Sequence, residues 1–190
     1  MLKAVIFDLD GTLTRFNLDI KAVKERIGGG GSEKNILDYI EGLGEAERAD
    51  ARALLEAYEC EAAMSTELNE GVENLFTFLR AGETKTALVT RNNRKAVDIA
   101  CSKFGLSFHA VVSREDARPK PARDQLDLAL ERLGVEREEA IFVGDHLFDL
   151  QAGKSAGIRT GLLKNSHANG ILKEADFVLD SMDQLIEMIR

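Results

Sequence analysis

Two carboxylates at the end of one apolar run give the first indication of chemistry in this sequence. Asp8 and Asp10 follow residues 4–7 (AVIF), a run typical of a buried strand. Side chains two apart on a strand point to the same face, so we expect both carboxylates to project together. Such groups repel each other unless a cation lies between them, and Mg2+ suits oxygen ligands. Gly11 allows a sharp turn and leaves backbone N–H groups open to an anion, although acidic turns also follow strands without any ligand.

A hydroxyl side chain ends a second apolar run. Thr90 follows residues 87–89 (ALV) and precedes Arg91 and Asn92. A hydroxyl at a strand end, beside the N-terminus of a helix, can hold a phosphate oxygen together with backbone N–H groups. The alternative is that Thr90 or Asn92 only caps the helix that follows. Arg91 is either a substrate contact or a solvated side chain, and the sequence leaves that choice open.

A lysine between two prolines is the third candidate. Pro119 and Pro121 fix the backbone on both sides of Lys120, and Pro121 suits the first position of a helix expected over residues 121–133. A lone lysine is usually a surface charge. A lysine held in this way at a helix start can instead neutralise a phosphate and neighbouring carboxylates.

Two more carboxylates follow a third apolar run, residues 140–143 (AIFV). Asp145 comes directly after Gly144, and Asp149 lies four residues further on. The alternative role for Asp149 is the N-cap of a helix expected over residues 150–156. His146 lies beside these acids, and we assign it no chemistry.

These four groups of residues resemble the motifs of the haloacid dehalogenase-like hydrolase superfamily. They occur in the family's order, as DxDGT at residues 8–12, a Ser or Thr at Thr90, a lysine at Lys120 and GDxxxD at residues 144–149. Many members have a small or amide residue where Arg91 stands. Within the family, the chain resembles the phosphoglycolate phosphatase and β-phosphoglucomutase-like subgroup with a small helical cap.

The resemblance implies a phosphatase that works through an aspartyl-phosphate. Asp8 is the implied nucleophile, and Asp10 is the implied acid that protonates the leaving oxygen and later activates water. Asp149 is implied to bind the metal through water or to orient Lys120. The implied Mg2+ ligands are Asp8, Asp10 through its backbone carbonyl, Asp145 and Asp149. The implied phosphate-binding residues are Gly11, Thr90, Arg91, Asn92 and Lys120.

The resemblance implies a small phosphorylated metabolite as the substrate, similar to phosphoglycolate or a sugar phosphate. Asp10 disfavours the dehalogenases and phosphonatases of this fold, which lack that acid. A phosphomutase similar to β-phosphoglucomutase keeps all four motifs and is the alternative enzyme. A metal- and phosphate-binding regulatory domain without turnover is a third hypothesis, which the complete set of motif residues disfavours.

Alternating strands and helices are expected to position these residues. From about residue 71, short apolar runs alternate with helical patterns, which predicts right-handed βαβ units. The fold class is therefore α/β, with a Rossmann-like parallel sheet as its core. Ligands of such sheets bind beyond the carboxyl ends of the strands, where Asp8 and Asp10 lie. Ser181 is expected to open the last helix with a capping box.

The segment after the first strand has a different pattern. It predicts three helices and no strand, and Ser32 is the expected N-cap of the second helix. The run Gly28–Gly31 is either a flexible connector or a specificity loop. We therefore expect an all-helical cap at residues 16–67, inserted into a core domain formed by residues 1–15 and 68–190.

Charge and composition exclude several classes of protein. The chain has 25 Lys and Arg against 33 Asp and Glu, a net charge of −8, which argues against nucleic-acid and anionic-membrane partners. Cys60 and Cys101 form no CxxC motif and are expected to be buried free thiols in a reducing compartment. There is no signal-peptide pattern and no membrane-spanning apolar run. We expect a cytoplasmic monomer or homodimer.

Overall fold

A parallel sheet carries the candidate residues. The computed structural model describes residues 2–165 and 170–190. Its six strands pair in parallel in the order β3-β2-β1-β4-β5-β6. They are β1 Ala4–Phe7, β2 Lys85–Val89, β3 Ala110–Val112, β4 Ala140–Gly144, β5 Arg159–Leu163 and β6 Phe177–Leu179. The predicted α/β fold with a Rossmann-like parallel sheet is confirmed.

The central strand β1 is apolar on both of its faces. Val5 and Phe7 pack into the apolar cluster on one side of the sheet, and Ala4 and Ile6 pack into the cluster on the other side. All four side chains are fully buried, as the period of two along a central strand requires. Asp8 is the next residue, so the buried strand fixes it at the carboxyl edge of the sheet.

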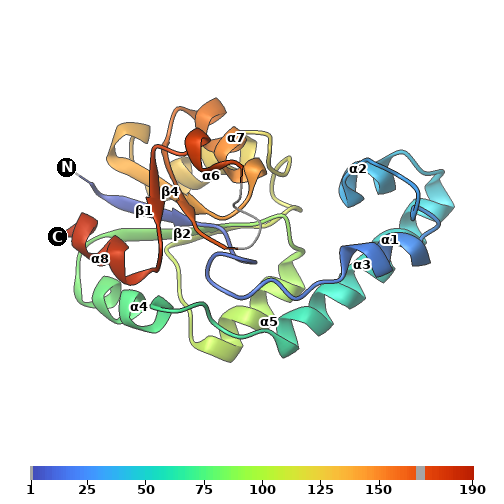
Figure 1. The fold of residues 1–190 in the computed structure, drawn as a ribbon, viewed down its shortest axis with the longest axis horizontal. Helices are drawn as coiled ribbons and strands as arrows, with labels where there is room; N and C mark the ends of the chain where they lie inside the picture. Colours follow the sequence, from blue (N-terminus) through green and yellow to red (C-terminus); the bar gives the residue numbers. More distant parts are fainter. Residues whose placement is uncertain (1, 166–169) are drawn as a thin grey trace.

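Helices cover both faces of the sheet (Figure 1). Helices α4, α5 and α8 lie on one face, and α6 and α7 lie on the other. Their bounds are α4 Val72–Ala81, α5 Arg94–Phe104, α6 Asp124–Leu133, α7 Leu147–Ala156 and α8 Asp183–Ile189. Short 3-10 helices occur at Arg137–Glu139 (η1) and Leu172–Glu174 (η2).

Three helices lie between β1 and α4, and we call them the inserted helices. They are α1 Ile20–Arg26, α2 Ile36–Glu41 and α3 Glu45–Ser65. Figure 1 shows α1 and α2 set apart from the sheet, with an apolar cluster of their own that includes Val23, Ile36, Ile40 and Leu55. The C-terminal part of α3 differs, because Cys60 and Ala63 pack into the cluster that contains α5. Helix α3 therefore joins the inserted helices to the sheet layer. Both cysteines are free thiols, but only Cys60 is buried, since Cys101 on α5 is partly exposed.

The start of α2 differs from the prediction. The N-cap is Asn35, whose side-chain oxygen accepts a hydrogen bond from the Asp38 N–H at 3.1 Å. Ser32 is therefore not the cap, and its hydroxyl instead accepts from the Lys34 N–H at 3.3 Å. Both residue types are good caps, and tertiary contacts decide between them.

The start of α6 also differs from the prediction. The helix begins at Asp124, so Pro121 is not its first residue. Residues 119–122 form a turn instead, and the Lys120 N–H donates to the side chain of Gln125. This turn directs the lysine side chain inward, as described below.

The last helix lacks the expected capping box. Helix α8 begins after Met182, and no side chain caps it. The side chain of Gln184, which a capping box would direct to Ser181, accepts from the Asp180 N–H at 2.7 Å. The hydrogen bond is displaced by one residue, so the prediction is wrong at this helix.

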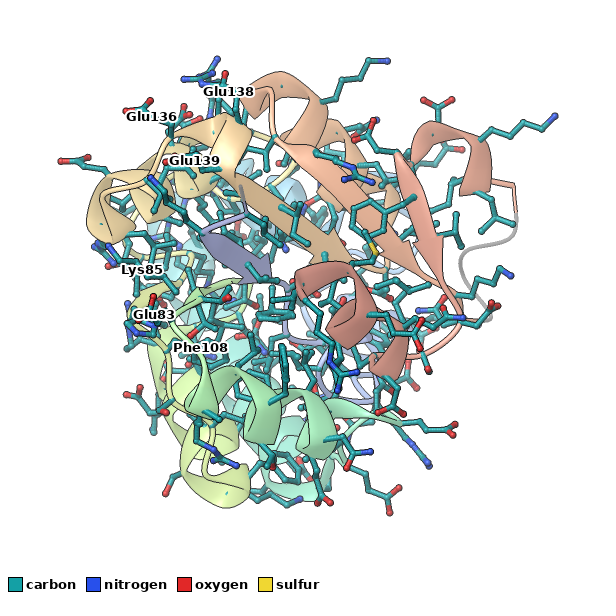
Figure 2. All side chains as sticks on the ribbon, turned by 90° about the vertical axis from the view of Figure 1, so that its left-hand side faces the viewer. Glu83, Lys85, Phe108, Glu136, Glu138 and Glu139 are labelled. Atoms are coloured by element: carbon teal, nitrogen blue, oxygen red, sulfur yellow. The ribbon has the colours of Figure 1, made fainter. Side chains whose placement is uncertain are left out.

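The end of the molecule away from the inserted helices is rich in charged side chains. Figure 2 looks at this end, where Glu136, Glu138 and Glu139 project from the segment around η1 and Lys85 lies nearby. Lys3 pairs with Glu139 at 2.6 Å. Among the helices of the described residues, none has the length and apolar character that crossing a membrane needs.

Candidate active site

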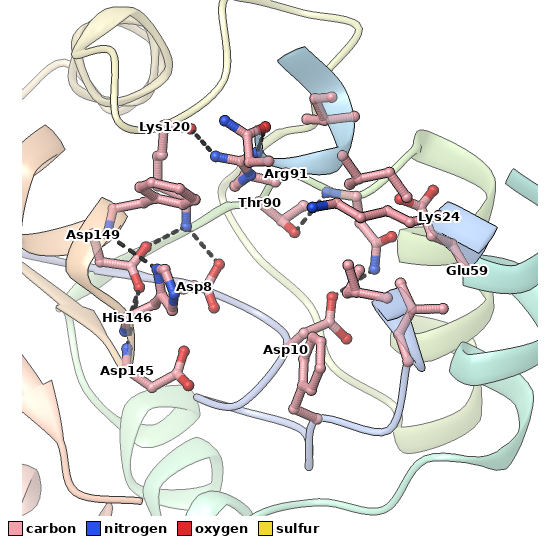
Figure 3. A pocket seen from close by; sticks show the side chains of 18 residues that line it. Asp8, Asp10, Lys24, Glu59, Thr90, Arg91, Lys120, Asp145, His146 and Asp149 are labelled. Carbon is pink, nitrogen blue, oxygen red and sulfur yellow. Dashed lines mark hydrogen bonds and ion pairs between the residues drawn. The ribbon is translucent and has the colours of Figure 1, made fainter. Parts of the chain in front are cut away.

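The predicted site residues meet at the carboxyl ends of three neighbouring strands. Asp8, Thr90 and Asp145 each come directly after the last residue of β1, β2 and β4. Because β1 lies between β2 and β4, these three residues are brought to one edge of the sheet. They line a cavity of about 340 Å³ that the inserted helices also help to form (Figure 3).

Three buried carboxylates form a cluster in this cavity. Asp8, Asp145 and Asp149 each offer an oxygen, and these oxygens lie within 4.8 Å of one another. Burial, with further repulsion from the Asp149 charge, raises the pKa of Asp8 to about 6. Burial and the nearby charges of Asp8 and Asp149 raise the pKa of Asp145 to about 8. A divalent cation with oxygen ligands would relieve this repulsion, and the donor set fits Mg2+.

Lys120 is a buried partner of these acids. Its Nζ donates to Asp8 Oδ1 at 2.5 Å, to Asp149 Oδ1 at 2.6 Å and to the Val89 carbonyl at 3.0 Å. Burial disfavours the ammonium charge, but Asp149 and Asp8 outweigh it and raise the pKa of Lys120. The side chain is only 1% exposed, so the alternative of a surface charge is wrong.

Asp149 orients Lys120 and also closes the loop before α7. Its Oδ2 accepts from the backbone N–H groups of Asp145 (3.2 Å) and His146 (3.0 Å). The N-cap of α7 is His146, whose Nδ1 accepts from the Phe148 N–H at 3.2 Å. The alternative of Asp149 as the N-cap is therefore wrong, because it lies at the third helical position and completes a capping box.

Asp10 lies beside the cluster and has different partners. Its Oδ2 accepts from the side-chain amide of Asn92 at 2.6 Å, and its Oδ1 accepts from the Thr14 hydroxyl at 3.5 Å. Burial, together with the charges of Asp8 and Glu59, raises the pKa of Asp10 to about 7. A carboxyl group with this pKa can both release and accept a proton near neutral pH.

Gly11 positions the loop and does not offer its N–H to an anion. That N–H donates to the Thr14 carbonyl at 2.6 Å, which corrects the expectation that it is open to a phosphate. Gly11 has a φ of 89°, and a Cβ at this position would lie 2.2 Å from Asp145 Oδ2. The residue must therefore be glycine for the loop to pass the metal-ligating candidate Asp145.

Thr90 and Asn92 do not cap α5. The cap is Asn93, whose side-chain oxygen accepts from the Ala96 N–H at 2.9 Å. Thr90 is buried in the cavity, and its Oγ1 accepts from the Asn92 N–H at 3.1 Å. The hydroxyl hydrogen of Thr90 remains to be donated, whereas the Asn92 amide contacts Asp10.

Arg91 connects the sheet layer to the inserted helices. It donates from NH1 to the Lys120 carbonyl at 2.5 Å and from NH2 to Asn35 Oδ1 at 2.8 Å. Its guanidinium lies 4.4 Å from the centre of the Phe148 ring. Burial lowers the pKa of Arg91, and the side chain lines the cavity. Of the two alternatives left open by the sequence, the solvated side chain is wrong.

Several residues of the site carry no signal in the sequence. Asn165 donates to Asp145 Oδ2 at 2.6 Å, and the Asn69 amide donates to the carbonyls of Gly11, Thr12 and Thr14. Gln125 joins Thr90 to the loop after β3, because its amide donates to the carbonyls of Thr90 and Ser113. These contacts link residues that are far apart in the chain, so no short motif contains them.

Glu59 links α3 to the sheet layer at the border of the cavity. It is buried, and it accepts from the Asn93 side chain and from Arg114, both at 2.5 Å. Burial raises the pKa of Glu59 despite the opposing charge of Arg114. The Glu59–Arg114 ion pair and the packing of α3 on α5 fix the inserted helices over the acid cluster.

Gly28–Gly31 does not line the cavity, but its neighbours on both sides do. Lys24 and Asn35 are part of the lining. The Gly29 N–H donates to the Lys24 carbonyl at 2.7 Å, and a Cβ on Gly29 would lie 2.7 Å from the Tyr39 ring. The loop therefore packs closely behind the residues that reach the cavity.

Comparisons with known proteins agree with the motifs. The family model described as haloacid dehalogenase-like hydrolase matches residues 19–163. An uncharacterised hydrolase from Saccharomyces cerevisiae is 32% identical over 200 residues, covering 100% of this chain and 91% of its own. Phosphoglycolate phosphatase 1 from Pseudomonas aeruginosa is 30% identical over 214 residues, covering 97% of this chain and 78% of its own.

Solved structures show the same fold. The crystal structure of CbbY from Rhodobacter sphaeroides in complex with phosphate superposes with a TM-score of 0.81 at 22% identity. The match covers 97% of this chain and 96% of CbbY. The resemblance predicted from the four motifs is therefore confirmed by sequence and by fold.

Proposed function

The chain belongs to the haloacid dehalogenase-like hydrolases, and on this premise we propose that it is a Mg2+-dependent phosphatase that acts through an aspartyl-phosphate. Its proposed substrate is a small phosphorylated metabolite, in keeping with phosphatase relatives such as the one from Pseudomonas aeruginosa. The observation that carries this proposal is the pairing of buried Asp8 with Lys120, beside an Asp10 that Asn92 holds.

In the first proposed step, Asp8 attacks the phosphorus atom. A bond forms between its carboxylate oxygen and phosphorus, and the bond from phosphorus to the ester oxygen breaks. With a pKa of about 6, Asp8 is largely ionised at neutral pH. The three N–H groups of Lys120 already donate to Asp8, Asp149 and the Val89 carbonyl. Its proposed role in this step is therefore to neutralise the negative charge of the carboxylates and the phosphate.

Asp10 is the proposed acid and base. Its proton goes to the leaving oxygen in the first step, and in the second step it takes a proton from the water that hydrolyses the aspartyl-phosphate. The pKa of about 7 suits both tasks. The hydrogen bond from Asn92 holds the carboxyl group in one orientation through both steps.

The acid cluster is the proposed Mg2+ site. Asp8, Asp145 and Asp149 would hold the ion, together with the backbone carbonyl of Asp10. The bound ion would supply charge neutralisation between the carboxylate nucleophile and the phosphate. The hydroxyl of Thr90 is the proposed donor to a phosphoryl oxygen, since it is buried in the cavity and its hydrogen is not used by Asn92.

The inserted helices are proposed to act as a cap, with the domain borders at residues 16–67. The two connections run side by side, because the Arg15 N–H donates to the Glu67 carbonyl at 2.8 Å and the Thr66 hydroxyl donates to the Arg15 carbonyl at 2.7 Å. Because the cap is attached at one place, its residues that line the cavity can differ without disturbing the acid cluster. We therefore assign substrate choice to the cap.

Release of inorganic phosphate tests the proposed function. Purified protein should release phosphate from p-nitrophenyl phosphate and from a panel of phosphorylated metabolites with Mg2+, and the Asp8→Asn variant should not. Transfer of the phosphoryl group to a second hydroxyl of the same sugar, without phosphate release, would instead show a phosphomutase. Binding of phosphate without turnover of any ester would show the regulatory domain.

A further inference from the structure

The part of the cavity that the inserted helices form is apolar. Its apolar side chains are Phe16, Leu18, Ile20, Ile36 and Leu37, joined by Phe148 of α7. Leu18, Ile20 and Leu37 also pack on the apolar cluster of the inserted helices. This surface is therefore the inner side of a packed cluster, so its shape is defined before a ligand binds.

An apolar surface constrains the leaving group. The phosphoryl group must lie at the acid cluster, so the rest of the substrate extends toward the inserted helices. A leaving group without apolar surface would displace water from these side chains and gain no contact in return. The leaving group that fits has an apolar body.

Lys24 adds one positive charge beside this apolar surface, where the other polar side chains, Asn35 and Glu59, already have partners. Figure 3 shows it on the other side of the cavity from Asp145 and Asp149. Its Nζ donates to the backbone carbonyls of Ser32 (3.1 Å) and Lys34 (2.6 Å). Within residues 2–165 and 170–190, no carboxylate lies within ion-pair distance of this ammonium group.

The two carbonyls leave Lys24 with one N–H to donate. An ammonium group has three donors, and a half-buried charge that has only neutral partners gains from an anion. Arg91 also lines the cavity, but its hydrogen bonds to the Lys120 carbonyl and to Asn35 and its contact with the Phe148 ring hold it between α2 and α7. Lys24 is therefore the cation best placed to receive an anionic group of the substrate.

We propose that the substrate is a phosphate monoester of an alcohol that has an apolar body and a carboxylate, and that Lys24 binds this carboxylate. This inference rests on the proposed phosphatase function. The apolar side chains of the inserted helices contact the body of the leaving group, and the acid cluster lies at the phosphoryl end.

Three phosphate esters of primary alcohols test this inference: 3-carboxybenzyl phosphate, benzyl phosphate and phosphoglycolate. Their leaving groups are chemically similar at the reacting oxygen, so kcat/KM reports recognition. We expect kcat/KM to fall in the order given, with about tenfold between the first two esters, as for one partly buried ion pair. Equal values for the two benzyl esters, or a higher value for phosphoglycolate, would overturn the inference.

A pair of lysine variants separates a binding role from a structural one. Lys24→Gln should lower the ratio of kcat/KM for 3-carboxybenzyl phosphate over benzyl phosphate by about tenfold. Lys21→Gln, an exposed lysine of the same helix, should leave that ratio unchanged. Equal loss on both esters in Lys24→Gln would mean that Lys24 acts only through the carbonyls that it holds, and would overturn the inference.

A second variant tests the apolar contact. Leu37→Asn should reduce the preference for benzyl phosphate over phosphoglycolate, with the melting temperature checked in parallel. An unchanged preference in the folded variant would contradict the proposed contact. Failure of the wild-type protein to hydrolyse even p-nitrophenyl phosphate would refute the phosphatase function itself, whereas hydrolysis without preference refutes only this inference.

Discussion

The side-chain amide of Asn92 donates a hydrogen bond to Asp10 Oδ2 at 2.6 Å. Asn92 is buried and follows the strand that ends at Val89, whereas Asp10 follows the neighbouring strand that ends at Phe7. Parallel pairing of the two strands brings these residues together. The Asn92 amide therefore contacts the proposed general acid, and its binding of phosphate stays a prediction.

The Asn92→Ala variant tests this contact. We expect kcat/KM to fall by about 10- to 100-fold, because general acid–base catalysis contributes about 10²–10⁴-fold and the variant loses only the orientation of Asp10. The inhibition constant of inorganic phosphate should stay within about twofold, again because only Asp10 is disoriented. A large weakening of phosphate inhibition would instead return Asn92 to phosphate binding. Asn74→Ala, at an exposed position of α4, is the matched control.

The sequence predicts the acid cluster well because each of its residues is marked by a short local pattern. Asp8, Thr90 and Asp145 each follow an apolar run, and parallel strands place their carboxyl ends at one edge. The roles of the three polar residues that follow Thr90 are harder to predict from the sequence. Arg91 contacts the inserted helices, Asn92 contacts Asp10, and Asn93 caps α5. These three residues are adjacent and all polar, so the amino-acid types alone do not tell which of them takes which role.

Contacts between the inserted helices and the sheet layer are beyond the reach of sequence patterns. Glu59 reads as one acid among many on α3, yet it is buried against Arg114, 55 residues later in the chain. Lys24 reads as a solvated charge of an amphipathic helix, yet it lines the cavity. The partner of Glu59 is set by how α3 packs on α5, and the place of Lys24 at the cavity is set by how the inserted helices lie over the sheet. No local period encodes either arrangement.

Glu59→Gln should destabilise the protein. The amide can still accept from Asn93, but the buried Arg114 charge then keeps only the exposed Glu115, at 3.8 Å, as a counter-ion, which costs about 3 kcal/mol. Urea denaturation at pH 7 measures this change, and Glu59→Met with Arg114→Met should recover part of the loss. Glu56→Gln is the control, since its exposed pair with Lys95 is worth at most about 1 kcal/mol. Equal effects of Glu56→Gln and Glu59→Gln would contradict the assignment.

Mg2+ should stabilise the folded protein without any substrate. Binding to the native state alone adds about 2.7 kcal/mol at a concentration 100 times Kd, a shift of several degrees in Tm. Asp145→Asn should abolish most of this shift, and Glu139→Gln, at the far end of the molecule, should keep it. Differential scanning calorimetry with Mg2+ and with chelator measures the effect. The same shift in Asp145→Asn as in the wild type would argue against the cluster as the ion site.

The ionised form of Asp116 should stabilise the folded protein, and this stabilisation should be lost as the pH falls. Burial alone would raise its pKa, but hydrogen bonds from Ser113 and Arg132 and the charge of Arg94 lower it to about 2. The unfolded chain, with a pKa of about 3.9, takes up this proton first as the pH falls. The contribution, about 2 kcal/mol, is therefore complete above pH ~5 and is lost between pH ~4 and ~2.

Asp116→Asn tests this pH dependence. The variant should be less stable than the wild type at pH 7, and the two should converge as the pH falls below about 3. Urea midpoints measured from about pH 7 to about pH 2 give the comparison. A constant difference across this range would mean that the charge of Asp116 does not contribute.

Substitution of the two aspartates that follow β1 should impair turnover in different ways. Asp8→Asn should abolish turnover, because an amide cannot attack phosphorus and ligates a metal poorly. Asp10→Asn keeps the backbone carbonyl and leaves Asp8 ionised, but it removes the group with a pKa of about 7 that donates and accepts the proton. Its rate should fall by about 10²–10⁴-fold.

Trapping of the phosphoenzyme distinguishes these two losses. With p-nitrophenyl phosphate, whose leaving group needs little protonation, Asp10→Asn should form the aspartyl-phosphate slowly and then retain it, because no base activates water. Rapid quench and intact-mass analysis should show an added phosphoryl group on Asp10→Asn and none on Asp8→Asn. A phosphorylated Asp8→Asn protein would place the nucleophile elsewhere, and the Asp8–Lys120 pair would then be structural.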